Sequence, residues 1–447
     1  MHNETICALA TPTGGALAII RISGEKTLEI LNNVLSKDLR KTPGNTTHYC
    51  RIGTDGETID EAMVSLFRTP HSYTGEDCAE ITFHGSPYIA RRILNLLTDN
   101  GCRMARPGEY TQRAFLNGKM DLSQAEAVAD LIASTNKATH QLAVSQLRGN
   151  ISSRLALLRE NLLHLTSMLE LELDFSDHEE LEFADRGELL TLAEEIGSHI
   201  QQLTRSFEQG KAMKEGIPVA IVGKTNVGKS TLLNALLKDD RAIVSNIHGT
   251  TRDTIEEAID INGVSFRFID TAGIRKTADT IEQIGIDRTY KAIGNARVVL
   301  WLIDAAPTAA EQAEMKERTR GKTLITVQNK IDQPAGETHH LEAADITISA
   351  KQGTHLKQLE ELIFQAAHLP DLSEHETIIS NARHYDILCQ AGQHIRRVIE
   401  GMQDNLSGDL LSEDLRQTLS ILAEITGGQI TTDEVLANIF SHFCIGK

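Results

Sequence analysis

The sequence predicts a multidomain α/β protein in which a doubly wound, mostly parallel sheet domain is inserted into an all-helical domain, behind an α+β domain at the N-terminus. Two patterns predict this architecture. Across residues 217–369 short apolar runs alternate with helical segments, which is typical of a doubly wound sheet. Long stretches with helical spacing lie on both sides of that region. We therefore expect one helical domain interrupted by an insertion, although two separate helical domains would give a similar pattern.

The expected boundaries follow these changes of pattern. Residues 1–118 mix β-rich runs, such as 17–22 and 79–83, with glycine and proline, as in a compact α/β or α+β unit. The helical domain is expected at residues 119–215 and 379–447, and the sheet domain at residues 216–378.

The helical parts carry start signals and apolar spacing. Ser123 and Glu126 have the spacing of a capping box. Apolar residues then recur at helical intervals, at Leu122, Ala125, Ala129 and Ile132 and again at Leu155, Leu158, Leu162, Leu165 and Leu169. The acidic stretch 174–182 predicts a solvated break between helices. Helical spacing returns across about 379–440.

Five apolar runs supply strands of the predicted sheet. They are residues 219–222, 266–269, 298–303, 324–327 and 346–348. The longest, 298–303, is far shorter than the roughly 20 apolar residues that cross a bilayer. The first residues also lack the basic and apolar regions of a secretory signal, so we expect a cytoplasmic protein without a membrane span.

Charge and cysteine content restrict the function further. The formal net charge of −18 opposes nonspecific binding to nucleic acid, because affinity for a phosphate backbone comes largely from Lys and Arg. Any RNA contact is therefore expected to be local or supplied by a partner. The 6 cysteines are scattered singly, which predicts reduced thiols and neither a zinc site nor a disulfide framework.

A phosphate-binding loop follows the first predicted strand of the sheet domain. Residues 223–230, GKTNVGKS, match the pattern GxxxxGK[ST] between a strand and a helix. Glycines let backbone N–H groups approach phosphates closely, Lys229 is expected to meet the β- and γ-phosphates, and the Ser230 hydroxyl is expected to bind Mg²⁺.

Three further elements follow in the order that a guanine nucleotide site requires. Asp270, Thr271, Ala272 and Gly273 form a DxxG element, which places a carboxylate beside the metal and a glycine N–H near the γ-phosphate. Asn329, Lys330 and Asp332 belong to an NKxD element, whose aspartate can accept from two guanine donors that adenine lacks. Ser349, Ala350 and Lys351 fit the loop that supports the base. Each follows a predicted strand, where such sheets bind ligands, so the sequence predicts GTP as the ligand.

The first switch is expected between the phosphate loop and DxxG, at Gly249–Asp253. Thr251 is our choice to complete the Mg²⁺ shell and to order this switch when the γ-phosphate is present. Thr250 is adjacent, and spacing alone does not decide between the two.

The catalytic group is less evident, because Ile274 stands where a Ras-type GTPase has its water-orienting glutamine. Glu282 is the nearest carboxylate of the second-switch region that could replace it, and Asp279 competes on position alone. Arg275 could be proposed as an arginine finger, but we favour a solvated switch arginine.

Residues outside the sheet domain identify a family. The segments 73–77 (YTGED), 106–127 (RPGEYTQRAFLNGKMDLSQAEA) and 443–447 (FCIGK) resemble the tRNA modification GTPases of the MnmE (TrmE) family. With the nucleotide motifs, the resemblance covers essentially the whole chain. It implies an N-terminal domain like tetrahydrofolate-binding folds, a homodimer joined through these domains, and a GTPase domain inserted into the helical domain.

The resemblance also implies a reaction and its partners. Members act with an FAD-dependent partner, in a heterotetramer or larger complex, to add an aminomethyl or carboxymethylaminomethyl group to C5 of the tRNA wobble uridine. A tetrahydrofolate derivative is implied as one-carbon donor. The implied folate-binding residues are Arg21, Glu80, Lys119 and Lys447, and Cys444 is implied as a possible functional thiol. The turn formed by residues 11–16 is shorter than the usual family form.

The same resemblance completes the nucleotide site. It implies potassium-stimulated hydrolysis coupled to approach of the two GTPase domains, and it assigns the water-activating role to Glu282. The implied K⁺ ligands are Asn226, Ser245, Ile247 and Thr250, and the remaining GTP contacts are Val227, Gly228 and Thr231.

Two alternatives remain at this level. A ribosome-assembly GTPase of the same superclass would usually carry a basic RNA-binding module with a GXXG loop, which this sequence lacks in a matching context. A scaffold with a non-hydrolysing nucleotide site is disfavoured by Lys229, Ser230, Asp270 and Thr251. Release of phosphate from GTP would exclude it.

Overall fold

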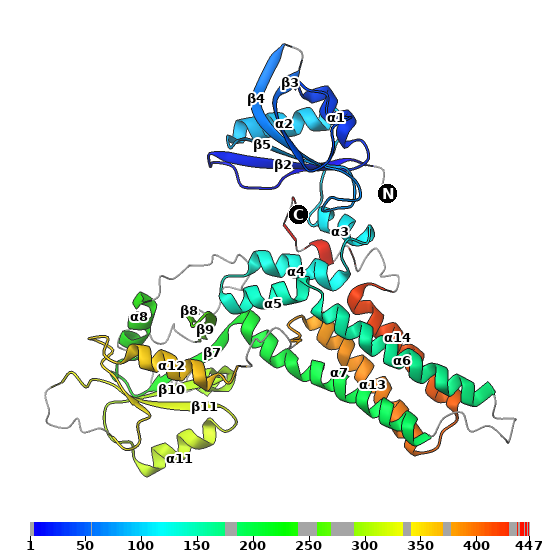
Figure 1. Cartoon of the computed structure of the whole chain (residues 1–447). Coiled ribbons are helices and arrows are strands. Elements are labelled where there is room, and N and C mark those ends of the chain that lie inside the picture. The colour runs from blue at the N-terminus through cyan, green and yellow to red at the C-terminus, as the bar shows by residue number, and fades with distance from the viewer. Residues whose placement is uncertain are drawn as a thin grey trace. The chain divides into compact units, whose positions relative to one another are not determined.

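The computed structural model describes residues 4–54, 56–174, 186–239, 257–269, 290–333, 341–369, 377–428, 436, 439–441, 443, 444 and 446. Contacts divide the chain into two compact units. The first comprises residues 1–132, 146–170 and 412–447, and the second comprises residues 133–145 and 171–411. Figure 1 labels the elements of both.

The first unit begins with a six-stranded sheet in the order β3-β4-β5-β2-β1-β6. Its neighbouring strands are antiparallel, except for the parallel pair β1 and β6. α1 and α2 cover one face, seen above β2 and β5 in Figure 1. The strands are β1 (Ile6–Leu9), β2 (Leu17–Ser23), β3 (Thr46–Thr54), β4 (Glu57–Phe67), β5 (Cys78–His84) and β6 (Arg103–Met104), and the helices are α1 (Thr27–Val34) and α2 (Pro87–Asp99). The two β-rich runs expected here are the neighbouring strands β2 and β5.

A buried ionic network joins two of the sequence segments that identified the family. Arg113, on α3 (Glu109–Leu116), is 4% exposed and donates to Glu76 Oε2 at 3.0 Å and to Glu109 Oε1 at 3.1 Å. Nearby, Asn117 Nδ2 donates to the Thr74 carbonyl at 2.7 Å. A buried charge is tolerated only when it is paired, so the residue types in segments 73–77 and 106–119 depend on one another.

The capping box predicted at Ser123 and Glu126 is wrong by two residues. α4 (Leu122–Ala133) is capped by Asp121, whose Oδ1 accepts the Gln124 N–H at 2.9 Å. Gln124 Oε1 accepts the Asp121 N–H in return at 3.0 Å. This reciprocal pair is the capping box, because the cap must be the residue that precedes the first helical turn. Ser123 lies inside that turn and donates to Asp121 Oδ1.

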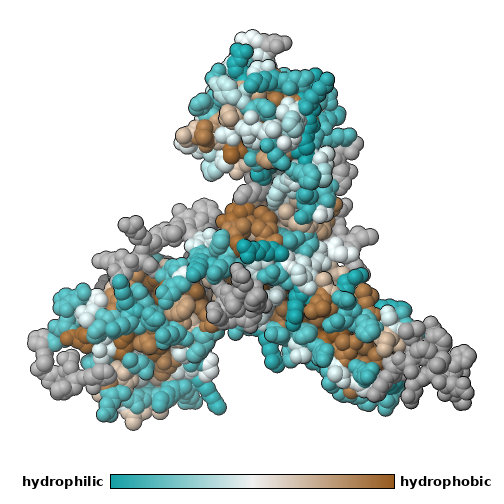
Figure 2. Space-filling view, viewed as in Figure 1, coloured by the Kyte–Doolittle hydropathy of each residue, from teal (hydrophilic) through white to brown (hydrophobic). Residues whose placement is uncertain are grey.

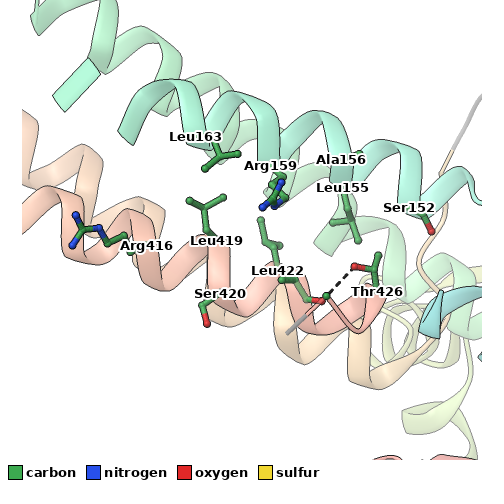
Figure 3. A pocket seen from close by; sticks show the side chains of 12 residues that line it. Ser152, Leu155, Ala156, Arg159, Leu163, Arg416, Leu419, Ser420, Leu422 and Thr426 are labelled. Carbon is green, nitrogen blue, oxygen red and sulfur yellow. Dashed lines mark hydrogen bonds between the residues drawn. The ribbon is translucent and has the colours of Figure 1, made fainter. Parts of the chain in front are cut away.

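α6 (Asn150–Asp174) carries the predicted leucine series, and all five leucines are buried. Its neighbour in this unit is α14 (Gly408–Thr426). Between these helices lies a groove of about 440 Å³, shown in Figure 3. Its lining is mainly apolar and includes two arginines: Ser152, Leu155, Ala156, Arg159, Leu163, Arg416, Leu419, Ser420, Leu422, Ala423, Thr426 and Gly428. None of the predicted site residues lines it.

The second unit contains the expected insertion. α7 (Arg186–Glu215) and α13 (Ala382–Gln403) lie side by side although the sheet domain separates them in sequence (Figure 1). The rings of Phe207 and Tyr385 stack with centroids 4.3 Å apart. The chain returns to α7 at Ile379, whose N–H donates to Ser206 Oγ at 3.0 Å. Helices before and after the sheet domain therefore form one helical pair. The short helix α5 (Lys137–Leu147) precedes them.

The inserted domain is a six-stranded sheet in the order β12-β11-β10-β7-β9-β8. Its pairs are parallel except β8 with β9. The strands are β7 (Ile217–Gly223), β8 (Glu257–Ile261), β9 (Val264–Phe268), β10 (Val298–Ile303), β11 (Thr323–Gln328) and β12 (Ile346–Thr347), and the helices are α8 (Lys229–Asp239), α11 (Ala309–Arg318) and α12 (Leu356–Ala366). α8 and α12 pack on one face, and α11 with residues 290–295 on the other. The predicted doubly wound, mostly parallel sheet is confirmed, and the five predicted runs are its strands other than β8.

Within the described residues, the helices are all too short or too polar to span a membrane. Over the N-terminal sheet, Figure 2 shows a mainly hydrophilic surface with small separate apolar patches. Exposed apolar residues of this sheet include Leu17, Tyr49 and Met63.

Candidate functional site

The phosphate loop lies between β7 and α8 as its sequence pattern predicts. Gly223 ends the strand, Lys229 begins the helix, and Asn226 between them has a φ of 64°. The Lys229 ammonium donates to the carbonyls of Gly223 at 2.7 Å and Lys224 at 2.8 Å, so it lies over the loop. Burial lowers the pKa of Lys229. Phosphate oxygens at this helix N-terminus would supply the missing negative charge and favour the ammonium.

Two glycines of this loop are required by close approach. A Cβ on Gly223 would lie 2.4 Å from the Leu302 carbonyl oxygen, and one on Gly228 would lie 2.2 Å from Asn329 Nδ2. Both residues also have positive φ, at 147° and 103°. Only glycine adopts these conformations without strain, so the loop conformation depends on both residues.

Asn329 joins the phosphate loop to the two base-binding loops. Its side chain is 3% exposed, Nδ2 donates to the Val227 carbonyl at 2.8 Å, and Oδ1 accepts the Ala350 N–H at 3.0 Å. A buried amide whose oxygen and nitrogen are both hydrogen-bonded holds the three loops together. The sequence predicted Asn329 as a nucleotide contact but gave no sign of this structural link, because its partners are 102 and 21 residues away.

Asp332, which is predicted to bind the base, is held by a buried serine. Ser349 Oγ donates to Asp332 Oδ1 at 2.7 Å, and Ser349 itself is fully buried. The Ser349 hydrogen bond lowers the pKa of Asp332, so the carboxylate stays ionised at neutral pH. Both carboxylate oxygens keep lone pairs that the guanine N1–H and exocyclic amine could use, one oxygen for each donor.

The structure therefore places the phosphate loop and both base loops at one edge of the sheet. The described members of the predicted site are Asn226, Val227, Gly228, Lys229, Ser230, Thr231, Asn329, Lys330, Asp332, Ser349, Ala350 and Lys351. The other members lie outside the described residues, namely Ser245, Ile247, Thr250, Thr251, Asp270, Thr271, Ala272, Gly273 and Glu282.

Replacing Gly228 by alanine tests the loop geometry. The new Cβ would displace Asn329 Nδ2 and occupy a φ of 103° that alanine disfavours. We expect the affinity for GDP to fall by about tenfold or more, equivalent to about 1.4 kcal/mol. Titration of the purified variant with a fluorescent GDP analogue measures this change.

Gly321→Ala is the matched control. Gly321 has a φ of 79°, but no atom lies within 4 Å of the position of its Cβ. It therefore carries the backbone strain without the collision with Asn329. Equal losses of GDP affinity in the two variants would contradict the role assigned to Gly228.

Two of the residues predicted to bind folate, Arg21 and Glu80, form an ion pair on the N-terminal sheet. Arg21 on β2 and Glu80 on β5 are cross-strand partners, and Arg21 Nη2 lies 2.7 Å from Glu80 Oε1. The guanidinium lies 5.6 Å from the ring centroids of both Tyr73 and Tyr110. Arg21 Nη1 also donates to the Gly446 carbonyl at 3.3 Å. The C-terminal segment thus meets the N-terminal sheet at Arg21, although Lys447 lies outside the described residues.

Lys119 contacts residues 68–77, the loop between β4 and β5 that carries Tyr73. Its ammonium donates to the Pro70 carbonyl at 2.9 Å, and its side chain lies 3.4 Å from the position of a Cβ on Gly75. Tyr73 of this loop faces Arg21, so Arg21 and Lys119 flank one loop. The sequence did not single out Tyr73 or Tyr110 as site residues, because an aromatic side chain in a segment of short strands and turns is more often part of the core.

The predicted functional thiol, Cys444, is free and exposed.

Comparison with known proteins gives full-length matches. A family model described as the MnmE helical domain matches residues 122–444, and one described as the GTP-binding protein TrmE N-terminus matches residues 5–119. The tRNA modification GTPase MnmE of Bacteroides fragilis is 52% identical over 468 residues, covering 100% of both chains. The proteins of the same name from Bacteroides thetaiotaomicron and Flavobacterium johnsoniae are 51% and 48% identical, again over 100% of each chain.

Proposed function

The chain belongs to the MnmE (TrmE) family of tRNA modification GTPases, and from this premise we propose that it hydrolyses GTP to drive modification of tRNA. The GTPase activity is proposed from the two hydrogen bonds of the Asn329 side chain, which hold the phosphate loop and the base loops together. Lys229 would contact the phosphates, and Asp332 would select guanine. We further propose that residues 216–378 form the GTPase domain, between helical segments 119–215 and 379–447 and behind an N-terminal domain of residues 1–118.

We propose the finer chemistry on the strength of the family. With an FAD-dependent partner, in a heterotetramer or larger complex, this cytoplasmic homodimer adds an aminomethyl or carboxymethylaminomethyl group to C5 of the wobble uridine of certain tRNAs. A tetrahydrofolate derivative would supply the one-carbon unit at Arg21, Glu80, Lys119 and Lys447. The cation, carboxylate and flanking aromatic rings around Arg21 suit a flat heterocycle with an amide edge and an acidic tail. Cys444 is proposed as a functional thiol near this site.

Mg²⁺ would be held by Ser230 and Thr251 together with the phosphates of GTP. Mg²⁺ is usually bound by a few protein oxygens plus substrate phosphates and water, and the hydroxyl of Ser230 at the start of α8 fits such a donor set. Bound there, the ion would neutralise charge that develops on the phosphate oxygens.

Wobble nucleosides test the proposal as a whole. In cells that lack the gene, mass analysis of hydrolysed tRNA should show loss of the C5-modified wobble uridine, restored by the wild-type gene but not by a Lys229→Ala variant. Unchanged wobble nucleosides together with accumulated ribosome precursors would instead favour the alternative, a ribosome-assembly GTPase.

Potassium dependence is a separate prediction. K⁺ bound by Asn226, Ser245, Ile247 and Thr250 would place positive charge near the β–γ bridge oxygen, where negative charge grows as the bond breaks. Asn226 is exposed in the phosphate loop, where such an ion could reach it. We expect turnover in KCl to exceed turnover in NaCl of equal ionic strength by about tenfold or more, or about 1.4 kcal/mol of barrier. Phosphate release measures both rates, and equal rates would remove potassium from the mechanism.

A further inference from the structure

The segment that leads from β10 into the first turn of α11 carries two carboxylates that face the nucleotide loops. We name residues 304–311, which include the first three residues of α11, the acidic turn. β10 lies between β7 and β11, with Leu302 level with Gly223 and Ile303 level with Gln328. Asp304, the next residue, therefore emerges between the phosphate loop and the base loop. Nothing in the nucleotide motifs pointed to this turn.

Each carboxylate of the acidic turn pairs with a lysine of a different loop. Asp304 Oδ2 lies 2.7 Å from Lys330 Nζ, with side chains 37% and 28% exposed. Glu311 Oε1 lies 2.7 Å from Lys224 Nζ. Glu311 is itself fixed, because Oε2 accepts the Thr308 N–H at 2.9 Å in the capping box of α11. The ion pair with Lys224, followed by this cap, lowers the pKa of Glu311 to about 2.

Lys330 lies in the predicted base loop, between the buried Asn329 and Asp332, and has a φ of 70°. Its ammonium is held by Asp304. Ordering a long side chain at the moment of binding would otherwise weaken affinity.

We propose that the acidic turn positions the nucleotide loops before GTP binds, with Asp304 orienting Lys330 of the base loop and Glu311 orienting Lys224 of the phosphate loop. Asp304 and Glu311 are positioning residues that act through the lysines. The proposal rests on the site being a guanine nucleotide site. It accounts for two ion pairs that, as partly exposed pairs, would add little to stability.

Asp304→Asn tests the proposal in the full-length protein. We expect the Kd for GDP to rise by about three- to tenfold, from the added cost of ordering Lys330. Turnover at saturating GTP should stay within twofold, and the unfolding midpoint should not change. Glu314→Gln is the matched control, because Glu314 is an exposed α11 carboxylate that pairs with Arg318 and Tyr290 instead. It should bind GDP as the wild type does.

A double-mutant cycle separates positioning from a general structural effect. In a Lys330→Met background, Asp304→Asn should cause no further loss of GDP affinity, because the ammonium through which Asp304 acts is already absent. The same result is expected for Glu311→Gln in a Lys224→Met background. Additive losses, or an unchanged Kd in the single variants, would overturn the proposal. Wild-type protein that fails to bind GDP would instead overturn the nucleotide site itself.

Discussion

Replacing Asp332 by asparagine is expected to weaken binding of GTP by about a thousandfold and to create a preference for xanthine nucleotides. The carboxylate would accept from two guanine donors, and each charge-assisted hydrogen bond contributes about 1.5–3 kcal/mol. In the variant one of these bonds becomes neutral and the other is replaced by two donors that face each other, a loss of about 4 kcal/mol, or about three powers of ten in Kd.

The surroundings of Asp332 determine how the asparagine would turn. Ser349 Oγ accepts the Gln352 N–H at 3.2 Å, and its hydrogen is donated to Asp332 Oδ1. In the variant that hydrogen would hold the amide oxygen in the place of Oδ1, so the amide nitrogen would replace Oδ2 opposite the exocyclic group of the base. Xanthine offers a carbonyl where guanine has an amine, and it would accept from this nitrogen.

Competitive titration with GDP and xanthosine diphosphate measures the exchange of preference. Ser349→Ala is the control, since it removes the orienting hydroxyl but leaves the carboxylate. It should weaken GDP binding modestly and keep the guanine preference. An Asp332→Asn protein with full affinity for GTP would show that the base lies elsewhere.

Removing the carboxylate of Glu282 is expected to separate binding from chemistry. Ile274 cannot orient a water, yet one water must be held in line with the γ-phosphate for hydrolysis. Glu282→Ala should therefore lower kcat by about a hundredfold or more, the range for loss of a positioned acid–base group, while GTP affinity stays within a few-fold. Single-turnover hydrolysis and equilibrium titration give the two numbers. This prediction rests on the sequence and the family, because residues 270–289 lie outside the described part of the chain.

Asp279→Ala is the control for Glu282. It removes a carboxylate from the same second-switch segment, where we expect a solvated residue with little effect on kcat. Slow hydrolysis in the Asp279 variant with normal hydrolysis in the Glu282 variant would exchange the two assignments. Loss of GTP binding in either variant would indicate that the segment has a structural role.

The sequence predicted the inserted domain well because its strands are buried on both faces. β10 is apolar at every position, and such a run is easily recognised. β8 was not recognised, because the buried Ile259 and Ile261 alternate with the exposed Ala258 and Asp260, as in an antiparallel edge strand with one covered face. β3 is similar, with exposed residues at alternate positions in its first half. Strands of this kind are defined by their neighbours as much as by their own residues.

The site was predictable to the extent that its chemistry is local in sequence. The loop around Lys229 and the residues around Asp332 each form a short motif, and the structure places both loops at one sheet edge. Contacts between motifs were not predictable, because they join residues far apart in the chain. Asp304 is 26 residues from Lys330, and Arg21 is 425 residues from Gly446. The Asp121 cap was missed for a different reason, since two overlapping cap patterns occur within six residues and only backbone geometry distinguishes them.

The return of the chain to α7 connects the inserted domain to the helical pair at both of its ends. The chain leaves α7 after Glu215 and comes back at Ile379, whose N–H donates to Ser206 of the same helix. A domain joined to one helix only would pass a displacement to that helix alone. Here, any displacement of the domain during GTP hydrolysis would act on the C-terminal end of α7 and on the N-terminal end of α13.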